Sequence, residues 1–438
     1  MENADFYKLE LMILKRLKGQ FVKIDKEKER EQLIIDIAKT IRPNVDAESL
    51  STIIKDITSL RPIEGLINTE TIEDVMVNNV QNIFVYDSKE GLIKVDVKLE
   101  SKEELELLVE KLKLYATNEA ANGNIYDVHL PNGSRANIVS SPLGYDITIR
   151  NFKSTTLSIL DLINYNELDY QIAARLWIYT DGFKVRPANL IIGGMPAAGK
   201  TTLLNSMFSF FRPEQRIVTI EETYELNTKT MENCVNLETS DDLPMIELVK
   251  NALRMRPDML IIGEVRGSEA NDMITAMNVG KIGMTTIHAP AARDVINRLE
   301  HFPMNVPQDI IPVIDAIIIV GQVYSKNKPT RKIIQISEIA GIETQILLSD
   351  LYRFDYKTGK GLPILPSVTY RDTLSNLLGI PPSDILAEEN VRANILYAMN
   401  KLGMRDIVSI NNIVKDYYDN PEATLKKLGL NLEPIIKV

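Results

Sequence analysis

The chain has 438 residues and a net charge of −10, and 45% of its residues are hydrophobic and 25% are charged. This length is too great for one ordinary hydrophobic core and predicts two domains. The acidic balance disfavours the broad basic surface that nucleic-acid binding requires, and the one cysteine, Cys234, excludes an intramolecular disulfide and a zinc site of several cysteines.

The start of the chain and its apolar runs bear on its location. Residues 1–5 show no basic segment followed by an apolar one, so we do not expect a signal peptide. The longest apolar run, residues 316–320, is far too short to span a membrane. We therefore expect a cytoplasmic protein that reaches a membrane only through a partner.

Residues 1–60 are expected to form a helical, highly charged segment. Within residues 29–41 the apolar side chains recur at helical spacing, at Leu33, Ile34, Ile37 and Ile41. This stripe favours a helix that packs on its own domain. The alternative is a helix that docks on another protein.

Residues 61–152 combine strand and helix signals. A helix is expected from Ser101 to Leu114, with Ser101 as N-cap and Glu104 as its capping-box partner. The strand signals lie at 72–78, 82–86, 92–99, 135–139 and 146–150, and a tight turn lies at 130–134. These elements predict an α+β domain that ends near residue 152.

After a linker at 153–166, apolar strands alternate with helices over residues 167–350, which predicts an α/β domain with a mostly parallel sheet. Residues 351–438 are expected to form a mostly helical C-terminal region, with helices at 388–402 and from Pro421. The expected strands of the sheet are 189–192, 216–220, 258–262, 283–287, 314–320 and 331–339.

Residues 194–201 have the spacing of a phosphate-binding loop, between an apolar strand and a helical run. Its glycines let backbone N–H groups face phosphates, and the helix N-terminus adds a favourable dipole. Lys200 is expected to reach the β- and γ-phosphates of ATP, and the Thr201 hydroxyl is expected to bind Mg²⁺. The candidate nucleotide-binding residues are Gly194, Pro196, Ala197, Ala198, Gly199, Lys200, Thr201 and Thr202.

Three polar residues follow strands of the same predicted sheet: Glu221, Glu264 and His288. Ligands of open parallel sheets bind at the carboxyl ends of the strands. Hydrolysis of ATP needs a group that orients or activates water, so both glutamates are candidate catalytic residues and His288 is a candidate sensor of the γ-phosphate. A solvated strand end is the alternative for each glutamate, and a structural side chain is the alternative for the histidine.

Gly263 lies where a nucleotide-site strand commonly carries an aspartate near the metal. Direct carboxylate ligation of Mg²⁺ from this position is therefore excluded. Thr201 and water must carry more of the coordination, with Glu221 or Glu264 behind the water.

Together these motifs resemble the type II/type IV secretion ATPase superfamily, which drives pilus assembly, archaeal surface filaments and secretion. The resemblance covers about residues 65–345. The sequences of the motifs at 253–258 and 263–267 favour the tight-adherence, conjugative and archaeal branch of this superfamily. Besides the phosphate loop, the matching segments are 130–135, 220–223, 253–258, 263–270, 284–289 and 297–300.

The resemblance implies a RecA-like ATPase domain in a homo-hexameric ring, with the nucleotide held between two domains. It also implies that Arg135 and Arg150 of the N-terminal domain reach the phosphates as catalytic residues, with a surface salt bridge as the alternative for each. The implied partners are a polytopic membrane platform protein and, indirectly, a pilin or the secretion machinery. The protein would lie at the inner face of the cytoplasmic membrane, without direct nucleic-acid contact.

Two residues depart from the family pattern. Glu222 stands where an aspartate is usual, and Lys281 stands where an earlier histidine is often found. The roles of both stay open, as do those of three arginines that match family positions: Arg254, Arg256 and Arg266.

The leading interpretation is a hexameric ATPase motor that couples ATP hydrolysis to assembly of a type IV pilus-like filament or to protein secretion. The alternatives are a conjugation or DNA-uptake motor, a retraction motor, and a nucleotide-dependent scaffold with negligible turnover. Stimulation of the ATPase by DNA, with a steep dependence on salt, would favour the DNA motor.

Overall fold

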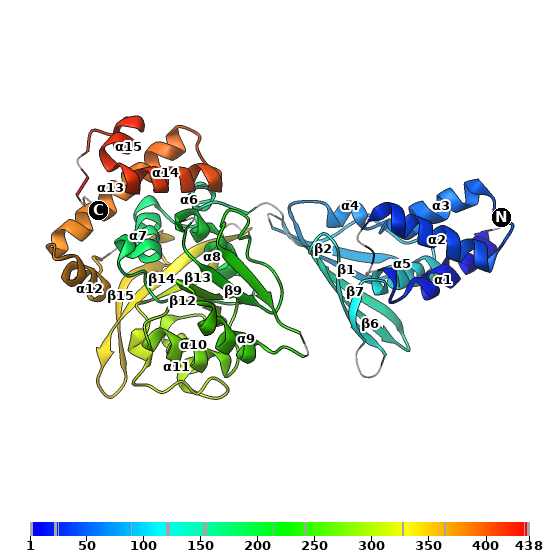
Figure 1. Ribbon diagram of the computed structural model, residues 1–438, viewed down its shortest axis with the longest axis horizontal. Coiled ribbons are helices and arrows are strands. Elements are labelled where there is room, and N and C mark those ends of the chain that lie inside the picture. Colours follow the sequence, from blue (N-terminus) through cyan, green and yellow to red (C-terminus); the bar gives the residue numbers. More distant parts are fainter. Residues whose placement is uncertain are drawn as a thin grey trace. The chain divides into compact units, whose positions relative to one another are not determined.

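The chain divides into two compact units, Met1–Thr155 and Thr156–Val438, which we describe separately (Figure 1). A computed structural model provides the coordinates. The residues that it describes are 3–21, 24, 26–88, 90–119, 123–151, 156–212, 214–240, 242–325, 328–362, 365–432 and 434–435.

Among its described residues, the first unit packs five α-helices with a seven-stranded sheet of order β3-β2-β1-β7-β6-β5-β4. Its helices are α1 (Asn3–Leu17), α2 (Glu27–Ile41), α3 (Ala47–Thr58), α4 (Glu64–Ile67) and α5 (Lys102–Lys113). Its strands are β1 (Ile72–Asn79), β2 (Asn82–Asp87), β3 (Gly91–Lys94), β4 (Ala116–Glu119), β5 (Ile125–His129), β6 (Arg135–Ser141) and β7 (Gly144–Arg150).

The helix expected at 29–41 packs on its own unit. Ile34 and Ala38 of α2 are fully buried in a cluster that also holds residues of α1, α3 and Leu114. The apolar stripe is therefore core-facing.

Three details of the first unit differ from expectation. Strand β3 ends at Lys94 rather than near residue 99, and an exposed ion pair of Lys98 and Asp96 lies in the segment that follows. Glu104 accepts from the amide of Glu100 and not from that of Ser101, although Ser101 caps α5 as expected. The short strands β4 and β5 were not predicted, because β4 is polar and β5 spans only five residues, of which the apolar Ile125 is exposed.

The second unit is built on a nine-stranded sheet of order β10-β9-β11-β12-β8-β13-β14-β15-β16, parallel from β10 to β13 and antiparallel beyond. The expected α/β fold class and all six expected strands are confirmed. The strands are β8 (Leu190–Gly194), β9 (Ile217–Glu221), β10 (Cys234–Glu238), β11 (Met259–Ile262), β12 (Ile282–Ile287), β13 (Ala316–Ser325), β14 (Lys328–Ile342), β15 (Ile346–Asp355) and β16 (Lys360–Gly361).

Helices cover both faces of this sheet, and two buried clusters lie on its opposite sides. The α-helices are α6 (Ile159–Asn164), α7 (Tyr170–Asp181), α8 (Lys200–Met207), α9 (Met245–Ala252), α10 (Glu269–Asn278), α11 (Ala292–Glu300), α12 (Thr369–Leu378), α13 (Pro382–Lys401), α14 (Ile407–Asp419) and α15 (Pro421–Lys427).

Two expected boundaries are corrected. The linker expected at 153–166 contains α6, whose Ile159 and Leu160 are fully buried in the core of the second unit; residues 153–155 of that linker lie outside the described residues. The boundary expected at residue 350 cuts through β15, because antiparallel pairing with β14 extends the sheet to Asp355.

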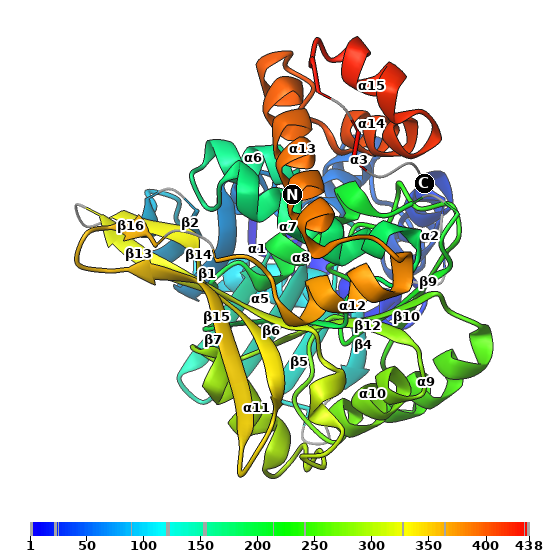
Figure 2. The same ribbon diagram turned by 90° about the vertical axis from the view of Figure 1, so that its left-hand side faces the viewer.

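The C-terminal helices belong to the same unit as the phosphate loop. Helices α13, α14 and α15 lie together beside α7 in both views (Figures 1 and 2). The guanidinium of Arg392 on α13 is 1% exposed and contacts Asp181 at 2.5 Å and Glu388 at 3.1 Å. It also lies 4.8 Å from the ring of Trp177. A buried charge of this kind is stable only with its partners in place, so α13 and α7 are held in one arrangement.

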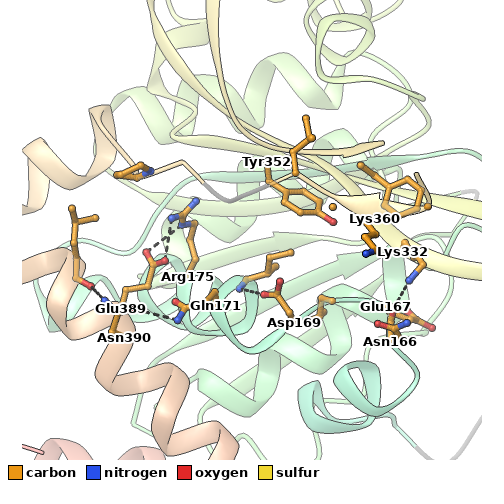
Figure 3. A pocket seen from close by; sticks show the side chains of 18 residues that line it. Asn166, Glu167, Asp169, Gln171, Arg175, Lys332, Tyr352, Lys360, Glu389 and Asn390 are labelled. Carbon is orange, nitrogen blue, oxygen red and sulfur yellow. Dashed lines mark hydrogen bonds and ion pairs between the residues drawn. The ribbon is translucent and has the colours of Figure 1, made fainter. Parts of the chain in front are cut away.

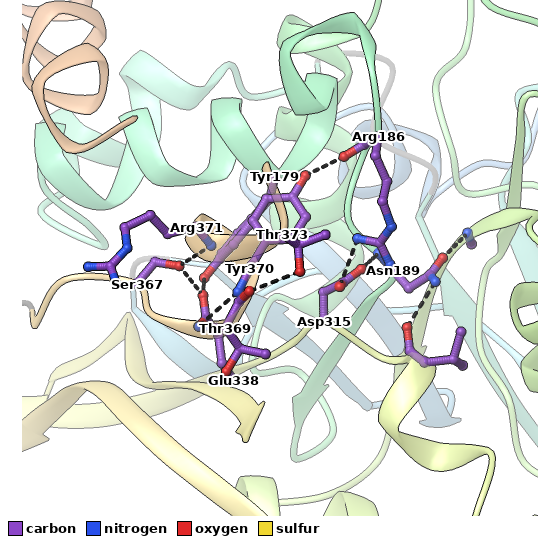
Figure 4. Close-up of polar contacts among 12 residues, drawn as sticks. Tyr179, Arg186, Asn189, Asp315, Glu338, Ser367, Thr369, Tyr370, Arg371 and Thr373 are labelled. Carbon is purple, nitrogen blue, oxygen red and sulfur yellow. Dashed lines mark hydrogen bonds and ion pairs between the residues drawn. The ribbon is translucent and has the colours of Figure 1, made fainter. Parts of the chain in front are cut away.

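A second buried network joins β14 to α12 and to the start of β8 (Figure 4). The carboxylate of Glu338 on β14 accepts from Tyr179 of α7 at 3.0 Å and from the amide of Thr369 at 3.0 Å. Tyr370 donates to the carbonyl of Arg186 at 2.6 Å.

Arg186 in turn pairs with Asp315 at 2.9 Å, and Asp315 accepts from the amide of Asn189 at 2.7 Å. The strand that leads into the phosphate loop is thereby anchored at its first residues.

Replacing Arg392 by methionine should lower the free energy of unfolding of the second unit by about 3–5 kcal/mol, because two buried carboxylates would lose their cation. Urea denaturation followed by the fluorescence of Trp177, the one tryptophan, measures this unit. Lys401→Met, at the exposed end of the same helix, is the control. Equal midpoints for the two variants would contradict the assignment.

Candidate nucleotide site

The phosphate loop connects β8 to α8. Gly199 precedes α8 with φ +97°, a conformation that L side chains rarely adopt. A Cβ on Gly194 would lie 2.6 Å from the carbonyl oxygen of Val320, so only glycine fits there. The two glycines therefore have the steric roles that a backbone cradle for phosphates requires, at the N-terminus of a helix.

Lys200 lies at the first position of α8 and is 7% exposed. Its ammonium donates to the carbonyl of Met195 at 3.5 Å and to Nδ1 of His288 at 3.0 Å. His288 follows β12, which is the immediate neighbour of β8 in the sheet. The order of the strands therefore brings the expected sensor directly to the lysine of the loop.

His288 also contacts a glutamate. Its Nε2 lies 3.1 Å from Oε1 of Glu264, which follows β11, the next strand of the sheet. Lysine can only donate, so Nδ1 accepts and the proton lies on Nε2. Burial, and next the charge of Lys200, lower the pKa of His288. The imidazole is therefore neutral near pH 7, between a cation and a carboxylate.

The chain of contacts continues to the surface through Arg266. Its Nε donates to Oε1 of Glu264 at 2.6 Å, and its Nη1 pairs with Glu222 at 2.7 Å. The open question about Arg266 and Glu222 thus has a geometric answer: the arginine ties the ends of β9 and β11 together.

Glu221 ends β9 and lies outside this chain of contacts. It is 3% exposed, and its Oε1 accepts from the amides of Glu225 and Leu226 at 2.9 and 3.0 Å. Oε2 has no hydrogen-bond partner among the described residues. Strands β11 and β12 separate Glu221 from β8, so its expected catalytic role stays a prediction and the structure gives it a clear role in holding residues 222–226.

Gly263 has a steric reason to lack a side chain. A Cβ there would lie 3.0 Å from Cγ of Glu221, and the carbonyl of Gly263 accepts from Thr286 at 2.7 Å. An aspartate at this position would require the side chain of Glu221 to shift by a few tenths of an ångström. Within the described residues there is no cluster of three or more His, Cys, Asp or Glu that could hold a metal. Thr201, the expected Mg²⁺ ligand, is partly buried.

The two arginines of the first unit are neighbours. Arg135 and Arg150 lie directly opposite each other on β6 and β7, so their side chains share one face of the sheet. This face is opposite the core, since the intervening Ala136 and Ile149 are buried. Asp74 of β1 lies directly opposite Arg150 on the same face, so a carboxylate of this sheet stands beside the two arginines. The expected role of the arginines in phosphate binding stays a prediction.

The remaining motif residues stay apart from the Lys200–His288–Glu264 contacts. Arg254 and Arg256 are exposed, and Arg256 ends a short turn in the left-handed conformation with φ +55°. Lys281 precedes β12, at the opposite end of that strand from His288.

Three contacts at the site were not predicted from the sequence. Arg298 of α11 donates to the carbonyl of His288, and Gln322 and Arg331 both donate to the carbonyl of Ala197. Arg298 lies in a segment that matches the family pattern, but that match assigns it no role. The contacts of Gln322 and Arg331 depend on the register between β13 and β14, which the local sequence does not specify.

A separate cavity of about 770 Å³ lies between α7, β14 to β16 and α13 (Figure 3). Residues of both charges line this cavity, among them Glu167 and Lys332. Arg175, which also lines it, forms an ion pair with Glu389 at 3.0 Å. It contains no residue of the phosphate loop.

Known proteins share the sequence pattern. Residues 56–345 match the family described as type II/IV secretion system protein. The chain is 36% identical over 242 residues to uncharacterized protein MJ0781 of Methanocaldococcus jannaschii, covering 52% of this chain and 33% of that protein. It is 32% identical over 183 residues to conjugal transfer protein TrbB of Rhizobium radiobacter, covering 39% and 56%.

The chain therefore spans one third of the first relative and little more than half of the second. Among solved structures, the Legionella pneumophila ATPase DotB is 19% identical with a TM-score of 0.48, over 80% of this chain and 93% of that one. In the part of the chain that the structure describes, none of the helices has the length and apolarity of a membrane span.

The buried carboxyl of Glu221 predicts a pH dependence of stability. Burial raises the pKa of Glu221 from 4.5 to about 7 in the folded protein. The stability that this group contributes is therefore present below pH 4.5 and is lost as the pH rises through about 7. Glu221→Gln stays neutral, so its free energy of unfolding relative to wild type should rise over this interval, by about 1–3 kcal/mol.

Chemical denaturation at several pH values measures this difference. Glu222→Gln, at the adjacent exposed position, should show no such trend. A difference for Glu221→Gln that is constant with pH would contradict the burial of its charge.

Proposed function

We propose an ATP-hydrolysing motor function for this chain, from the premise that it belongs to the type II/IV secretion system protein family. The observation that carries the proposal is the hydrogen-bonded chain from Lys200 through His288 to Glu264 at the phosphate loop. Family membership supports ATP as the nucleotide, and a basic, an imidazole and a carboxylate group at one sheet edge support hydrolysis rather than binding alone.

The protonation pattern supports separate roles for Lys200 and His288. Lys200 has three donor hydrogens, and phosphate oxygens bind an ammonium more strongly than a neutral imidazole does. On nucleotide binding Lys200 would therefore turn from His288 to the phosphates. His288 would keep its Nε2 proton on Glu264 and present Nδ1 as an acceptor, so the histidine would report whether the lysine is engaged.

In this proposal Glu264 orients the attacking water. Its Oε1 is occupied by His288 and by Arg266. Its Oε2 would accept a hydrogen bond from the water molecule. Thr201 and water would hold Mg²⁺, whose charge offsets the charge that develops on the transferring phosphoryl group.

We further propose that the chain works as a homo-hexamer on a membrane platform protein, in assembly of a pilus-like filament or in protein secretion. The family description supports secretion. The relative named as a conjugal transfer protein supports the second candidate, a conjugation motor, and stimulation of the ATPase by DNA separates the two.

Glu264→Gln should preserve ATP binding and lower turnover at least a hundredfold, because an amide cannot take the proton of the attacking water. Lys200→Ala should instead weaken ATP binding itself. Titration with a fluorescent ATP analogue and phosphate release measure the two effects. Glu247→Gln, an exposed glutamate of α9, is the control; turnover in Glu264→Gln equal to the control would exclude its catalytic role.

Arg135→Ala and Arg150→Ala should each lower turnover about tenfold or more and leave nucleotide affinity within about threefold, because a guanidinium stabilises the transition state more than the ground state. Lys98→Ala, an exposed cation of the same unit, is the control. The assignment fails if both arginine variants turn over ATP at the rate of Lys98→Ala.

A further inference from the structure

The hairpin of β13 and β14 extends past the strand that leads into the phosphate loop. The parallel pairing of β13 with β8 ends at Val320 and Gly194, but β13 continues to Ser325. In this extension Gln322 is paired with Arg331 across the hairpin. Directly opposed residues of an antiparallel pair project to the same side, so the two side chains form one unit.

Both side chains donate to one carbonyl of the phosphate loop. Nε2 of Gln322 and Nε of Arg331 each lie 3.2 Å from the carbonyl oxygen of Ala197. The stem of Arg331 also packs against the loop, since a Cβ on Gly199 would lie 3.0 Å from its Cδ.

Ala197 is where the loop needs such support. Its φ is +59°, a left-handed conformation that costs a non-glycine residue roughly 1–3 kcal/mol. The peptide that joins it to Ala198 is planar and trans, so its C=O and N–H point in opposite directions. Two donors on the carbonyl therefore fix the direction of the Ala198 N–H.

That N–H lies next to the lysine of the loop. It donates to the carbonyl of Met195 at 3.2 Å, and the same carbonyl accepts from Lys200 at 3.5 Å. Rotation of the Ala197–Ala198 peptide would break the hydrogen bond from Ala198 to this carbonyl. The carbonyl that accepts from Lys200 would then lose its second donor. The hairpin therefore acts on Lys200 through a single peptide group.

The hairpin is itself held near the loop. Lys332 donates to the carbonyl of Asn166 at 2.7 Å, and the amide of Ile333 donates to the carbonyl of Glu167 at 3.0 Å. These residues follow Arg331 in β14, so its backbone is anchored to the segment that precedes α7.

We propose that Gln322 and Arg331 are positioning residues that hold the phosphate loop in its binding-competent conformation through the carbonyl of Ala197. The inference rests on the proposed function, because it assumes that the loop binds the phosphates of ATP. Neither residue needs to touch the nucleotide.

Arg331→Met tests this inference, because methionine keeps an apolar stem against Gly199 and removes every donor. Its affinity for ADP should fall about tenfold, the effect of one charged hydrogen bond. Gln322→Leu should lower it about threefold, and Arg331→Lys should stay within threefold of wild type. Isothermal titration with ADP measures affinity, and steady-state ATPase assays should show a raised KM with kcat within about twofold.

Arg353→Met, an exposed arginine of β15 that contacts Asp350, is the matched control and should bind ADP as wild type does. Thermal melting without nucleotide checks that each variant is folded. If Arg331→Met does not fold, the Gln322→Leu and Arg331→Lys results decide.

The possible outcomes distinguish failure of the proposed function from failure of the positioning role alone. A wild type that binds no ADP overturns the proposed function and, with it, this inference. Normal ADP affinity in both Arg331→Met and Gln322→Leu overturns the inference alone. A loss in Arg331→Met with no change in Gln322→Leu indicates a direct contact between arginine and nucleotide, and it also overturns the positioning role.

Discussion

The 3.0 Å hydrogen bond between Lys200 and His288 joins the phosphate loop to the end of the neighbouring strand. It exists because β12 pairs directly with β8, so that the two carboxyl ends coincide. Glu264 extends the contact to β11, and Arg266 extends it to the residue after β9. Polar side chains that lie far apart in the chain thus form one connected series along the edge of the sheet.

Buried polar contacts elsewhere hold the second unit together. Asp315 holds the amide of Asn189 at the start of β8, and Arg392 fastens α13 to the buried Asp181 on α7. A desolvated charge tolerates little displacement from its partner. The C-terminal helices are therefore part of the packed second unit rather than a separate tail.

The local motifs made much of the fold and site predictable. The alternation of apolar strands and helices predicted six strands of the second sheet, and the glycine and lysine spacing predicted the loop. Local patterns failed where pairing partners decide the structure. Strand β10 was missed because it is a partly exposed edge strand, and the boundary at residue 350 was wrong because β15 is defined by its pairing with β14.

The sequence by itself determined the identity of the chemical groups: a lysine and glycines in a loop, and Glu264 and His288 after apolar strands. These signals are local, because they depend on spacing over a few residues. Only the tertiary structure decided that His288 contacts Lys200, that Glu221 is buried beside Gly263, and that Gln322 and Arg331 meet at Ala197. The physical reason is that strand order and register set which distant residues become neighbours, and no short segment carries that information.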